Sequence, residues 1–251
     1  MVFKLKEKNM VLQRLYRDYV CYVEEISVVE EDYLWQDVSV YVDEPRSIQE
    51  FLIVRTRGGS LGAYMMAENP AIIREFAEIL KAMRDFRIHL QTSIRVEHYV
   101  KQFMSWLPRT YTVRYCRADS KTFKSHCLHR KGAIRLTIEN VKRLEPTASP
   151  YFIKRIETAP MYGYVNEKGE LVAMSGVGFL TKKSFAISYT ETEPEYRSQG
   201  IAKCLTSLSS EPLISKGLVG VYSADITNEP SLRVARALGF LPYRDLMCFY
   251  S

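Results

Sequence analysis

Long apolar runs are missing from this chain of 251 residues. No stretch approaches the roughly eighteen apolar residues that a membrane-spanning helix needs, and the segment from Met1 to Asn9 lacks the apolar core of a secretory signal. We therefore expect a cytoplasmic protein without a membrane partner. A chain of this length buries roughly three quarters of its unfolded surface, so two domains are expected to be stable without a disulfide or a metal.

Cysteine is scarce, and its spacing forms no familiar pattern. The five cysteines are an odd number and include no C-x-x-C pair. This argues against a disulfide framework and a four-cysteine zinc site, and it favours a reducing compartment. One cysteine, Cys127, does lie between His126 and His129, but a closed zinc site would need a fourth ligand from elsewhere. We expect no bound metal and interpret this stretch as a polar linker.

Acidic residues are nearly absent from the segment between Arg109 and Arg143. Ten basic residues stand there against two acidic ones, Asp119 and Glu139. Such a segment could bind nucleic acid, an anionic surface or the phosphate of a coenzyme. The alternative is a solvated connector between two domains. Because no nucleic-acid motif or pattern of stacking aromatic residues accompanies the cations, we favour the connector and expect no nucleic acid partner.

The most informative feature that is present is the sequence TETEPEYRSQGIAK at residues 190–203. It reads as a strand that leads directly into a helix. Gly200 permits a tight turn and close approach of a ligand, and the small Ala202 leaves the first helical turn uncovered. Unpaired N–H groups and the positive end of a helix dipole bind phosphate, and Arg197 and Lys203 add charge. The pattern R-x-x-G-x-A therefore indicates a pyrophosphate site, the alternative being a helix that merely starts at Gly200.

A second motif follows at a suitable distance. The expected strand at residues 218–224 precedes NEPSLRVARALGF at residues 228–240, a helix that Asn228 can cap and Gly239 can end. Together the strand, R-x-x-G-x-A helix, strand, N-x-x-S helix and Leu-Gly-Phe resemble the acyl-CoA-binding core of the GNAT acyltransferase superfamily. Within it, YTETEPEYR at residues 189–197 is similar to the branch of glycine N-acyltransferase-like proteins.

The resemblance covers about half of the chain, from Ala133 to Ser251. It implies an acyl-CoA-dependent N-acyltransferase, with acetyl-CoA favoured as the co-substrate, whose pantetheine arm pairs with the strand before the phosphate loop. The residues implied to contact the coenzyme are Thr190, Glu191, Thr192, Arg197, Ser198, Gln199, Gly200, Ile201, Ala202, Lys203, Asn228 and Ser231.

Acyl transfer needs a base for the amine and a hydrogen-bond donor for the oxyanion. The resemblance implies that the N–H of Thr192 donates the hydrogen bond to the oxyanion. Glu191 and Glu193 are the candidate bases, because strand alternation places both on one face. The alternative for each is an ordinary surface carboxylate at the end of a strand.

The acid that protonates the leaving thiolate is displaced or absent. Many GNAT enzymes carry a tyrosine where this chain has Ala235. Tyr222, our catalytic candidate, stands beside Ser231 and Tyr243 as a possible replacement, and a thiol pKa of about 8.5 also allows the thiolate to leave unprotonated. The departure keeps open a second class of function, a noncatalytic acyl-CoA-binding sensor.

The first half repeats the architecture without the phosphate loop. Its expected order is an amphipathic helix at residues 9–23, then strand, strand, helix, strand, helix and strand, with Asn69 and Pro70 opening the central helix. The stretch GAYMMAE at residues 62–68 stands where R-x-x-G-x-A would be. We predict a mixed α/β fold of two GNAT-like domains in tandem: residues 1–128, degenerate and without a coenzyme, and residues 129–251, with the acyl-CoA site.

Four further expectations concern the second half and its partners. Residues 184–192 should form one central strand, and Pro212 should end the helix that starts at Gly200 near Ser210. A cleft between two such domains favours a small-molecule amine or amino acid as the acceptor, with a protein or peptide amine as the alternative. We expect a monomer or a homodimer.

Overall fold

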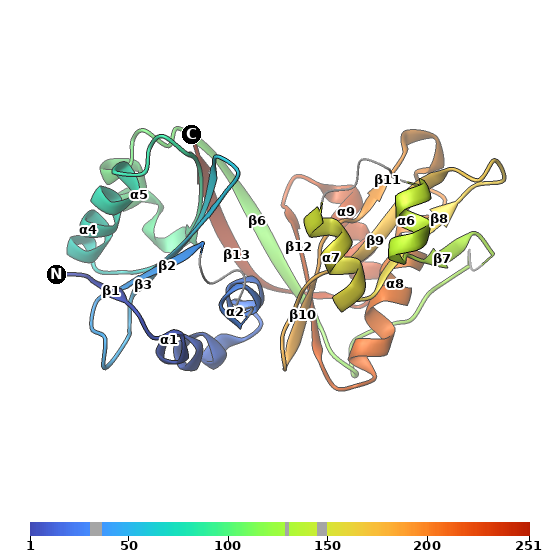
Figure 1. Cartoon of the computed structure of the whole chain (residues 1–251), viewed down its shortest axis with the longest axis horizontal. Coiled ribbons are helices and arrows are strands. Elements are labelled where there is room, and N and C mark those ends of the chain that lie inside the picture. Colours follow the sequence, from blue (N-terminus) through green and yellow to red (C-terminus); the bar gives the residue numbers. More distant parts are fainter. Residues whose placement is uncertain (31–36, 129–130, 145–149) are drawn as a thin grey trace. The chain divides into compact units, whose positions relative to one another are not determined.

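The computed structural model describes residues 1–30, 37–128, 131–144 and 150–251 (Figure 1). Two compact units are present. Unit 1 is Met1–Arg114 with Arg244–Ser251, and unit 2 is Tyr115–Tyr243. Residues 115–128 therefore group with the second unit and the end of the chain with the first, whereas the ranges 1–128 and 129–251 stay a prediction about the folding domains.

Unit 1 is built on a mostly antiparallel sheet in the order β1-β2-β3-β4-β5-β13, in which only β4 and β5 among these neighbours run parallel. Its elements in chain order are β1 (Phe3–Leu5), α1 (Lys8–Leu15), α2 (Val23–Glu30), β2 (Val38–Val42), β3 (Phe51–Arg57), β4 (Ser60–Met66), α4 (Pro70–Lys81), β5 (Arg87–Ser93), α5 (Glu97–Phe103) and the first part of β6 (Arg109–Ala118).

The helix α4 confirms its sequence signals. The side chain of Asn69 accepts the N–H of Ala71 at 2.9 Å, and Pro70 occupies the first helical position, where its missing N–H costs nothing. The stripe that includes Ile73 and Phe76 is buried in one core with side chains of β3, β4, β5, α5 and β13. This core fixes the β4-α4-β5 crossover.

The single helix expected over residues 9–23 is wrong. The helix α1 ends at Leu15, a short 3-10 turn covers Tyr16–Asp18, and α2 begins at Val23. Asp18 causes the break, because its carboxylate accepts the N–H of Cys21 and its carbonyl accepts the N–H of Tyr22, both at 3.1 Å. A side chain that competes for backbone donors in this way starts a new helix rather than continuing the old one.

Unit 2 has the strand order β12-β10-β9-β8-β7, with β11 paired to β9 and β6 beside β12. Among the strand pairs of this unit whose residue register is described, β10 and β12 run parallel and the others run antiparallel. Its elements are β7 (Ala133–Arg135), α6 (Ile138–Leu144), α7 (Pro150–Thr158), β8 (Met161–Val165), β9 (Leu171–Leu180), β10 (Ser184–Ile187), β11 (Glu191–Thr192), α8 (Ile201–Ile214), β12 (Val219–Asp225), α9 (Glu229–Ala237) and the start of β13 (Leu241–Tyr250). The strands β8 and β9 form an antiparallel hairpin around residues 166–169.

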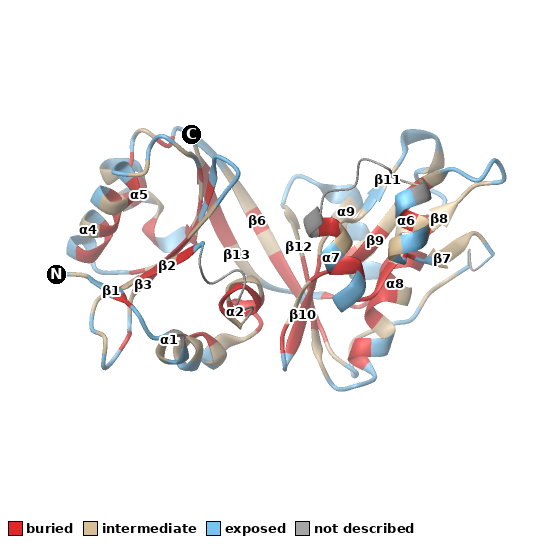
Figure 2. Ribbon diagram, viewed as in Figure 1, coloured by how far each residue is buried: buried red, intermediate tan, exposed pale blue. Residues whose placement is uncertain are grey.

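The helix α8 passes through Pro212 and ends at Ile214, so the expected stop near Ser210 is wrong. A proline in a helix removes one N–H and strains the carbonyl four residues earlier, but it does not remove the packing beyond it. Leu213 and Ile214 are both buried, and Figure 2 shows buried stretches on α8 beside intermediate and exposed ones. Burial of the last turn offsets the lost hydrogen bond.

The terminal strand β13 completes the sheet of unit 1. Leu246 to Tyr250 pair antiparallel with Ser93 to His89 of β5. The residues from Tyr115 onward in β6, a strand of the first half of the chain, belong to unit 2. Each unit therefore contains a strand segment that the other half of the sequence supplies. Within the described residues, no helix is long and apolar enough to cross a membrane.

Candidate active site

The parallel pair β10 and β12 separates at Tyr222. Their ladder runs from Ser184 and Val219 to Ile187 and Tyr222, and the pairing of β10 with β9 shifts register between Ala186 and Ile187. Tyr189 then takes a left-handed backbone conformation with φ of 67°, and its ring packs edge-on against Phe152. The single strand expected over residues 184–192 is thus wrong, because the chain leaves β12 and re-enters the sheet as β11.

The strand β11 presents the backbone of Thr192 to the open side. The N–H of Glu193 donates to the carbonyl of Val172 on β9 at 2.9 Å, and Thr192 lies opposite Ala173. Because backbone groups alternate in direction along an antiparallel strand, the N–H of Thr192 points away from β9. Its carbonyl does the same and accepts Nε of Arg197 at 2.9 Å. The role of the Thr192 N–H as oxyanion donor stays a prediction.

The two candidate bases have exposed side chains, Glu191 on β11 and Glu193 directly after it. The Thr192 hydroxyl between them is different, since its oxygen is buried and has no hydrogen-bond partner among the described residues. A buried polar atom without a partner costs free energy, which a ligand that bonds to it would recover.

The start of α8 has the geometry that its sequence predicted. Gly200 is the N-cap with φ of 84°, a left-handed conformation that favours glycine, and as a glycine it has no side chain to cap the helix. The carbonyl of Gly200 accepts the N–H of Cys204 at 3.0 Å, so the helical ladder begins there. The amides of Ile201, Ala202 and Lys203 precede that first bond and are the ones an anion would bind.

The preceding loop carries the other predicted phosphate contacts. Arg197, Ser198 and Gln199 are exposed, and Ser198 also has a positive φ of 63°. The Gln199 side chain donates to the carbonyl of Glu195 at 3.1 Å, within the loop. Two left-handed residues in three turn the chain sharply around its own amides, a form of concave backbone site that binds anions.

The corresponding helix start in unit 1 is already filled by the protein. One oxygen of the Glu50 carboxylate accepts the N–H groups of Glu68 and Asn69, at 2.7 and 2.6 Å. The Asn69 side chain takes the next donor, the N–H of Ala71. A carboxylate of the chain thus stands where α4 would bind a pyrophosphate, which gives a structural reason for the predicted absence of a coenzyme there.

We expect one acetyl-CoA per chain. Among the helices that the structure describes, α8 offers uncapped amides at the carboxyl end of a parallel pair, whereas the start of α4 holds Glu50. Isothermal titration of the intact protein should saturate near one equivalent. Glu50→Gln, which keeps the size of the side chain, should leave that number unchanged. Two equivalents in the unmodified protein would contradict the assignment of α8 as the coenzyme helix.

Five hydroxyl groups form a row at the separated strands. The Tyr222 hydroxyl lies 2.9 Å from Ser231 Oγ on α9, and the Thr190 hydroxyl is the second one that acts on the phenol, lowering its pKa. Thr190 Oγ1 lies 3.0 Å from Ser175 Oγ on β9, which lies 2.9 Å from Thr206 Oγ1 on α8. Sequence reasoning found Tyr222, Thr190 and Ser231 but missed Ser175 and Thr206, because a single serine in an apolar strand and a threonine in a helix carry no distinctive pattern.

Tyr222 is buried, and burial raises the pKa of its phenol above the ordinary value. Desolvation disfavours the phenolate, while the hydrogen bonds from Ser231 and Thr190 act in the opposite direction. The Cys116 thiol is the titratable neighbour that contributes, and it raises the pKa slightly further. The phenol is therefore protonated at neutral pH.

The other acid candidate lies elsewhere. Tyr243 is 38% exposed on β13, and the Arg117 guanidinium lies 5.1 Å from its ring centre. Ala235, where the resemblance implied a tyrosine, is fully buried in the same cluster as Tyr222 and Phe240. Tyr222 therefore enters this core from β12, whereas a tyrosine at position 235 would enter it from α9. Asn228 caps α9 as predicted, since its side chain accepts the N–H of Ser231 at 3.2 Å.

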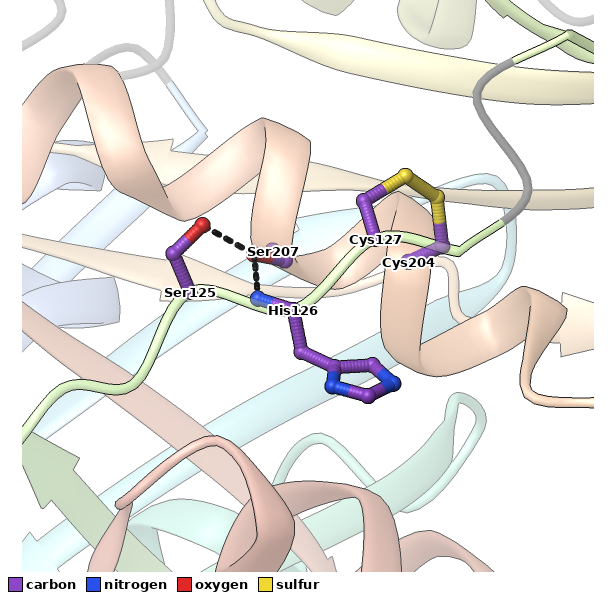
Figure 3. The surroundings of a disulfide bond; sticks show 5 residues. All are labelled: Ser125, His126, Cys127, Cys204 and Ser207. Atoms are coloured by element: carbon purple, nitrogen blue, oxygen red, sulfur yellow. Dashed lines mark hydrogen bonds between the residues drawn. A yellow bond between two sulfur atoms is a disulfide. The ribbon is translucent and has the colours of Figure 1, made fainter.

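A disulfide joins Cys127 to Cys204, so the expectation of no disulfide is wrong (Figure 3). The segment before Cys127 lies along α8, where Ser207 Oγ accepts the N–H of His126 at 2.9 Å and contacts the Ser125 hydroxyl at 3.4 Å. The bond therefore ties residues 125–127 to the first turns of the helix. No group of three metal-binding side chains occurs among the residues described, which do not include His129.

Thiol counting tests the disulfide. Unfolded, unreduced protein should react with three thiol equivalents, from Cys21, Cys116 and Cys248, and the count should rise to five after reduction. A link that spans 77 residues restricts the unfolded chain, so reduction should lower the free energy of unfolding by about 4 kcal/mol. Five reactive thiols without reduction would contradict the bond and support the predicted reducing, cytoplasmic compartment.

Part of the basic segment pairs with β13. The Arg114 guanidinium makes two hydrogen bonds to the Asp245 carboxylate, at 2.9 and 2.7 Å. The Arg109 guanidinium lies 5.7 Å from the ring centre of Tyr250. These first cations of the segment lie in the strand β6, so the interpretation as a solvated connector can apply only to the later part of the segment. Arg130 lies outside the described residues.

Solved structures share this fold along most or all of the chain. A Drosophila melanogaster protein matches with a TM-score of 0.70 at 11% identity, covering 99% of this chain and 97% of that one. A GCN5-related N-acetyltransferase-like protein from Streptococcus suis gives 0.64 at 16% identity, with coverages of 98% and 100%. A tandem GNAT protein from the clavulanic acid biosynthesis pathway gives 0.61 at 13% identity, with coverages of 100% and 98%.

These likenesses confirm the predicted fold class, a mixed α/β fold of the tandem GNAT kind. Neither the protein-family models nor the curated proteins contain a match to the sequence.

Proposed function

We propose that this protein is an acyl-CoA-dependent N-acyltransferase that uses acetyl-CoA and carries its single active site in unit 2. The separation of β10 from β12 directly before an uncapped, glycine-opened helix carries the proposal. It leaves backbone groups of β11 for the pantetheine arm and the amides of α8 for the pyrophosphate. The GNAT fold of the chain supports this assignment.

The amine attacks the thioester carbonyl, and the N–H of Thr192 stabilises the oxyanion. A carboxylate at Glu191 or Glu193 takes the proton that the amine loses, directly or through water, and both side chains have the solvent access that this needs. Thr190, Arg197, Ser198, Gln199, Lys203 and Asn228 complete the coenzyme-binding surface in this proposal.

Tyr222 completes the reaction as the acid. When the intermediate collapses, the carbon–sulfur bond breaks, its electron pair goes to sulfur, and sulfur takes the phenolic proton. The proton from the amine later returns to the phenolate through solvent, so the net products are an amide and free coenzyme A. Tyr222 fits this role because it lies where the strands separate and stays protonated at neutral pH.

The acceptor we propose is a primary amine of a small molecule or amino acid, as in the glycine N-acyltransferase-like branch that the sequence resembles. We further propose that the protein is located in the cytoplasm and that its active form is a monomer or a homodimer. The exposed carboxylates of Glu191 and Glu193 suit a cationic amine, which they would attract and then deprotonate.

A panel assay tests the function. The protein is incubated with acetyl-CoA and single amines, glycine and other amino acids included, and both N-acetylated product and free coenzyme A are measured by mass spectrometry. We expect both products in equal amounts, only with an amine present, and neither with Gly200→Asp. Tight coenzyme binding without turnover on any amine, including short peptides, would instead support the noncatalytic sensor that Ala235 leaves open.

A further inference from the structure

The row of hydroxyl groups at Tyr222 has a direction that decides what the phenol can do. Each hydroxyl carries one proton to donate. Thr206, Ser175 and Thr190 are joined in sequence by two hydrogen bonds, and Tyr222 is joined to Ser231 by a third. The Thr190 hydroxyl also lowers the pKa of the Tyr222 phenol, which places it at the end of the row that faces Tyr222. If the hydroxyl protons point away from Tyr222, the phenol donates its own hydrogen bond to a protein oxygen. If they point toward it, that proton is available to a ligand.

We propose that Thr206, Ser175 and Thr190 form a one-way chain of donors that ends on the Tyr222 oxygen and leaves the phenolic proton for the departing sulfur. In this arrangement Thr206 donates to Ser175, Ser175 to Thr190, and Thr190 and Ser231 to Tyr222. These four are positioning residues, since they act through the phenol. The proposal deepens the proposed function, on which its catalytic meaning rests.

Burial makes the direction matter. Ser175 and Thr206 are fully buried, so water cannot replace a lost partner there, and the Ser175 carbonyl is itself held by the Ser209 hydroxyl at 3.0 Å. Hydrogen bonds that run in one direction strengthen one another in such surroundings. When Tyr222 gives up its proton, the phenolate therefore finds two donors already in place, and no hydroxyl has to rotate.

The chain also connects two parts of the site. Thr206 lies on α8, the helix whose first turn is proposed to bind the pyrophosphate, while Ser175 lies on β9 and Thr190 in the link between β10 and β11. The acid is thus oriented from the coenzyme helix as well as from α9 through Ser231. This explains why a tyrosine on β12 can replace one on α9.

The titration of Tyr222 tests the direction without reference to turnover. Fluorotyrosine incorporated throughout the protein lowers phenol pKa values into an accessible range, and the fluorine resonance of Tyr222 is identified by its loss in Tyr222→Phe. Thr190→Val removes the hydroxyl and keeps the shape. If Thr190 donates to the phenolate, its loss should raise the Tyr222 midpoint by about one pH unit, since such a bond contributes about 1.5 kcal/mol.

Matched variants make the result decisive. Thr190→Ser and Thr206→Ser keep the hydroxyl and should leave the midpoint unchanged, whereas Ser175→Ala and Thr206→Val should raise it by progressively smaller amounts. Ser231→Ala, at a partly exposed position, should raise it without disturbing the core. A lower midpoint in folded Thr190→Val would mean that the phenol donates into the chain, and an unchanged midpoint would mean that the two groups are uncoupled; either result overturns the proposal.

Turnover provides the second readout once an amine is found. Thr190→Val should lower kcat about tenfold, and it should lower kcat no further in a Tyr222→Phe background. Additive losses in the double variant would show that Thr190 acts independently of Tyr222, contrary to the proposal. Absence of turnover with the expected titration shifts would overturn the proposed function alone.

Discussion

Gly200→Asp should weaken acetyl-CoA binding at least about 100-fold, the largest effect on binding that we expect. The carboxylate would stand at the amides of α8 and repel the pyrophosphate, and the lost hydrogen bonds to a charged group add to the repulsion, for a total above about 3 kcal/mol. Isothermal titration calorimetry measures it directly.

The matched control is Gly200→Asn. Asparagine and aspartate have nearly the same shape, and both adopt the left-handed conformation of Gly200 more readily than most residues do. Asn therefore reproduces the backbone cost without the charge, and we expect it to weaken binding by less than about tenfold. Equal losses in both variants would trace the effect to the backbone, and unchanged affinity in folded Gly200→Asp would reject the coenzyme site.

Tyr222→Phe should lower kcat about 100-fold and leave the KM for acetyl-CoA nearly unchanged. A well-placed general acid contributes about 10² or more to the rate, and phenylalanine keeps the packing against Phe240. Steady-state kinetics on the amine found in the panel assay measure the loss. Tyr243→Phe is the control, because that ring lies under Arg117 on β13, and it should retain full activity.

The pH dependence follows from the same phenol. An acid must be protonated to act, and burial raises the pKa of Tyr222 above the ordinary value of about 10. Its protonated form is thus present at all lower pH values and is lost only as pH rises through the raised pKa. We expect no alkaline fall in kcat from this group below about pH 10, and a fall near pH 8 that disappears in Tyr222→Phe would disprove the raised value.

The sequence predicted best where local chemistry decides the structure. Asn69 with Pro70, Asn228, and Gly200 each control a helix end through their own side chain or backbone, and all three helices begin as expected. It failed where distant packing decides. Pro212 predicts the end of a helix, yet the buried Leu213 and Ile214 continue α8. Residues 184–192 form two strands because of the register shift after Ala186 and the contact of Tyr189 with Phe152, and neither can be predicted from local sequence.

The same distinction applies to the candidate site. The phosphate loop is one continuous stretch, so its spacing was readable. The hydroxyl row draws Ser175, Thr190, Thr206, Tyr222 and Ser231 from five places in the chain, and the Cys127–Cys204 link joins residues 77 positions apart. No local pattern encodes such neighbours. Glu50 likewise reaches the start of α4 from 18 residues away.

Most of the strand β13 follows unit 2 in the sequence but belongs to the sheet of unit 1, so it determines when that sheet can be completed during synthesis. Leu246–Tyr250 are synthesised long after β5, so a nascent chain that has completed β5 and α5 still exposes Ser93 to His89 as an unpaired strand edge. Such edges recruit other chains. The sheet of unit 1 can therefore be completed only after β13 has been synthesised, and a premature stop before Leu246 would harm the part of the protein that was made first.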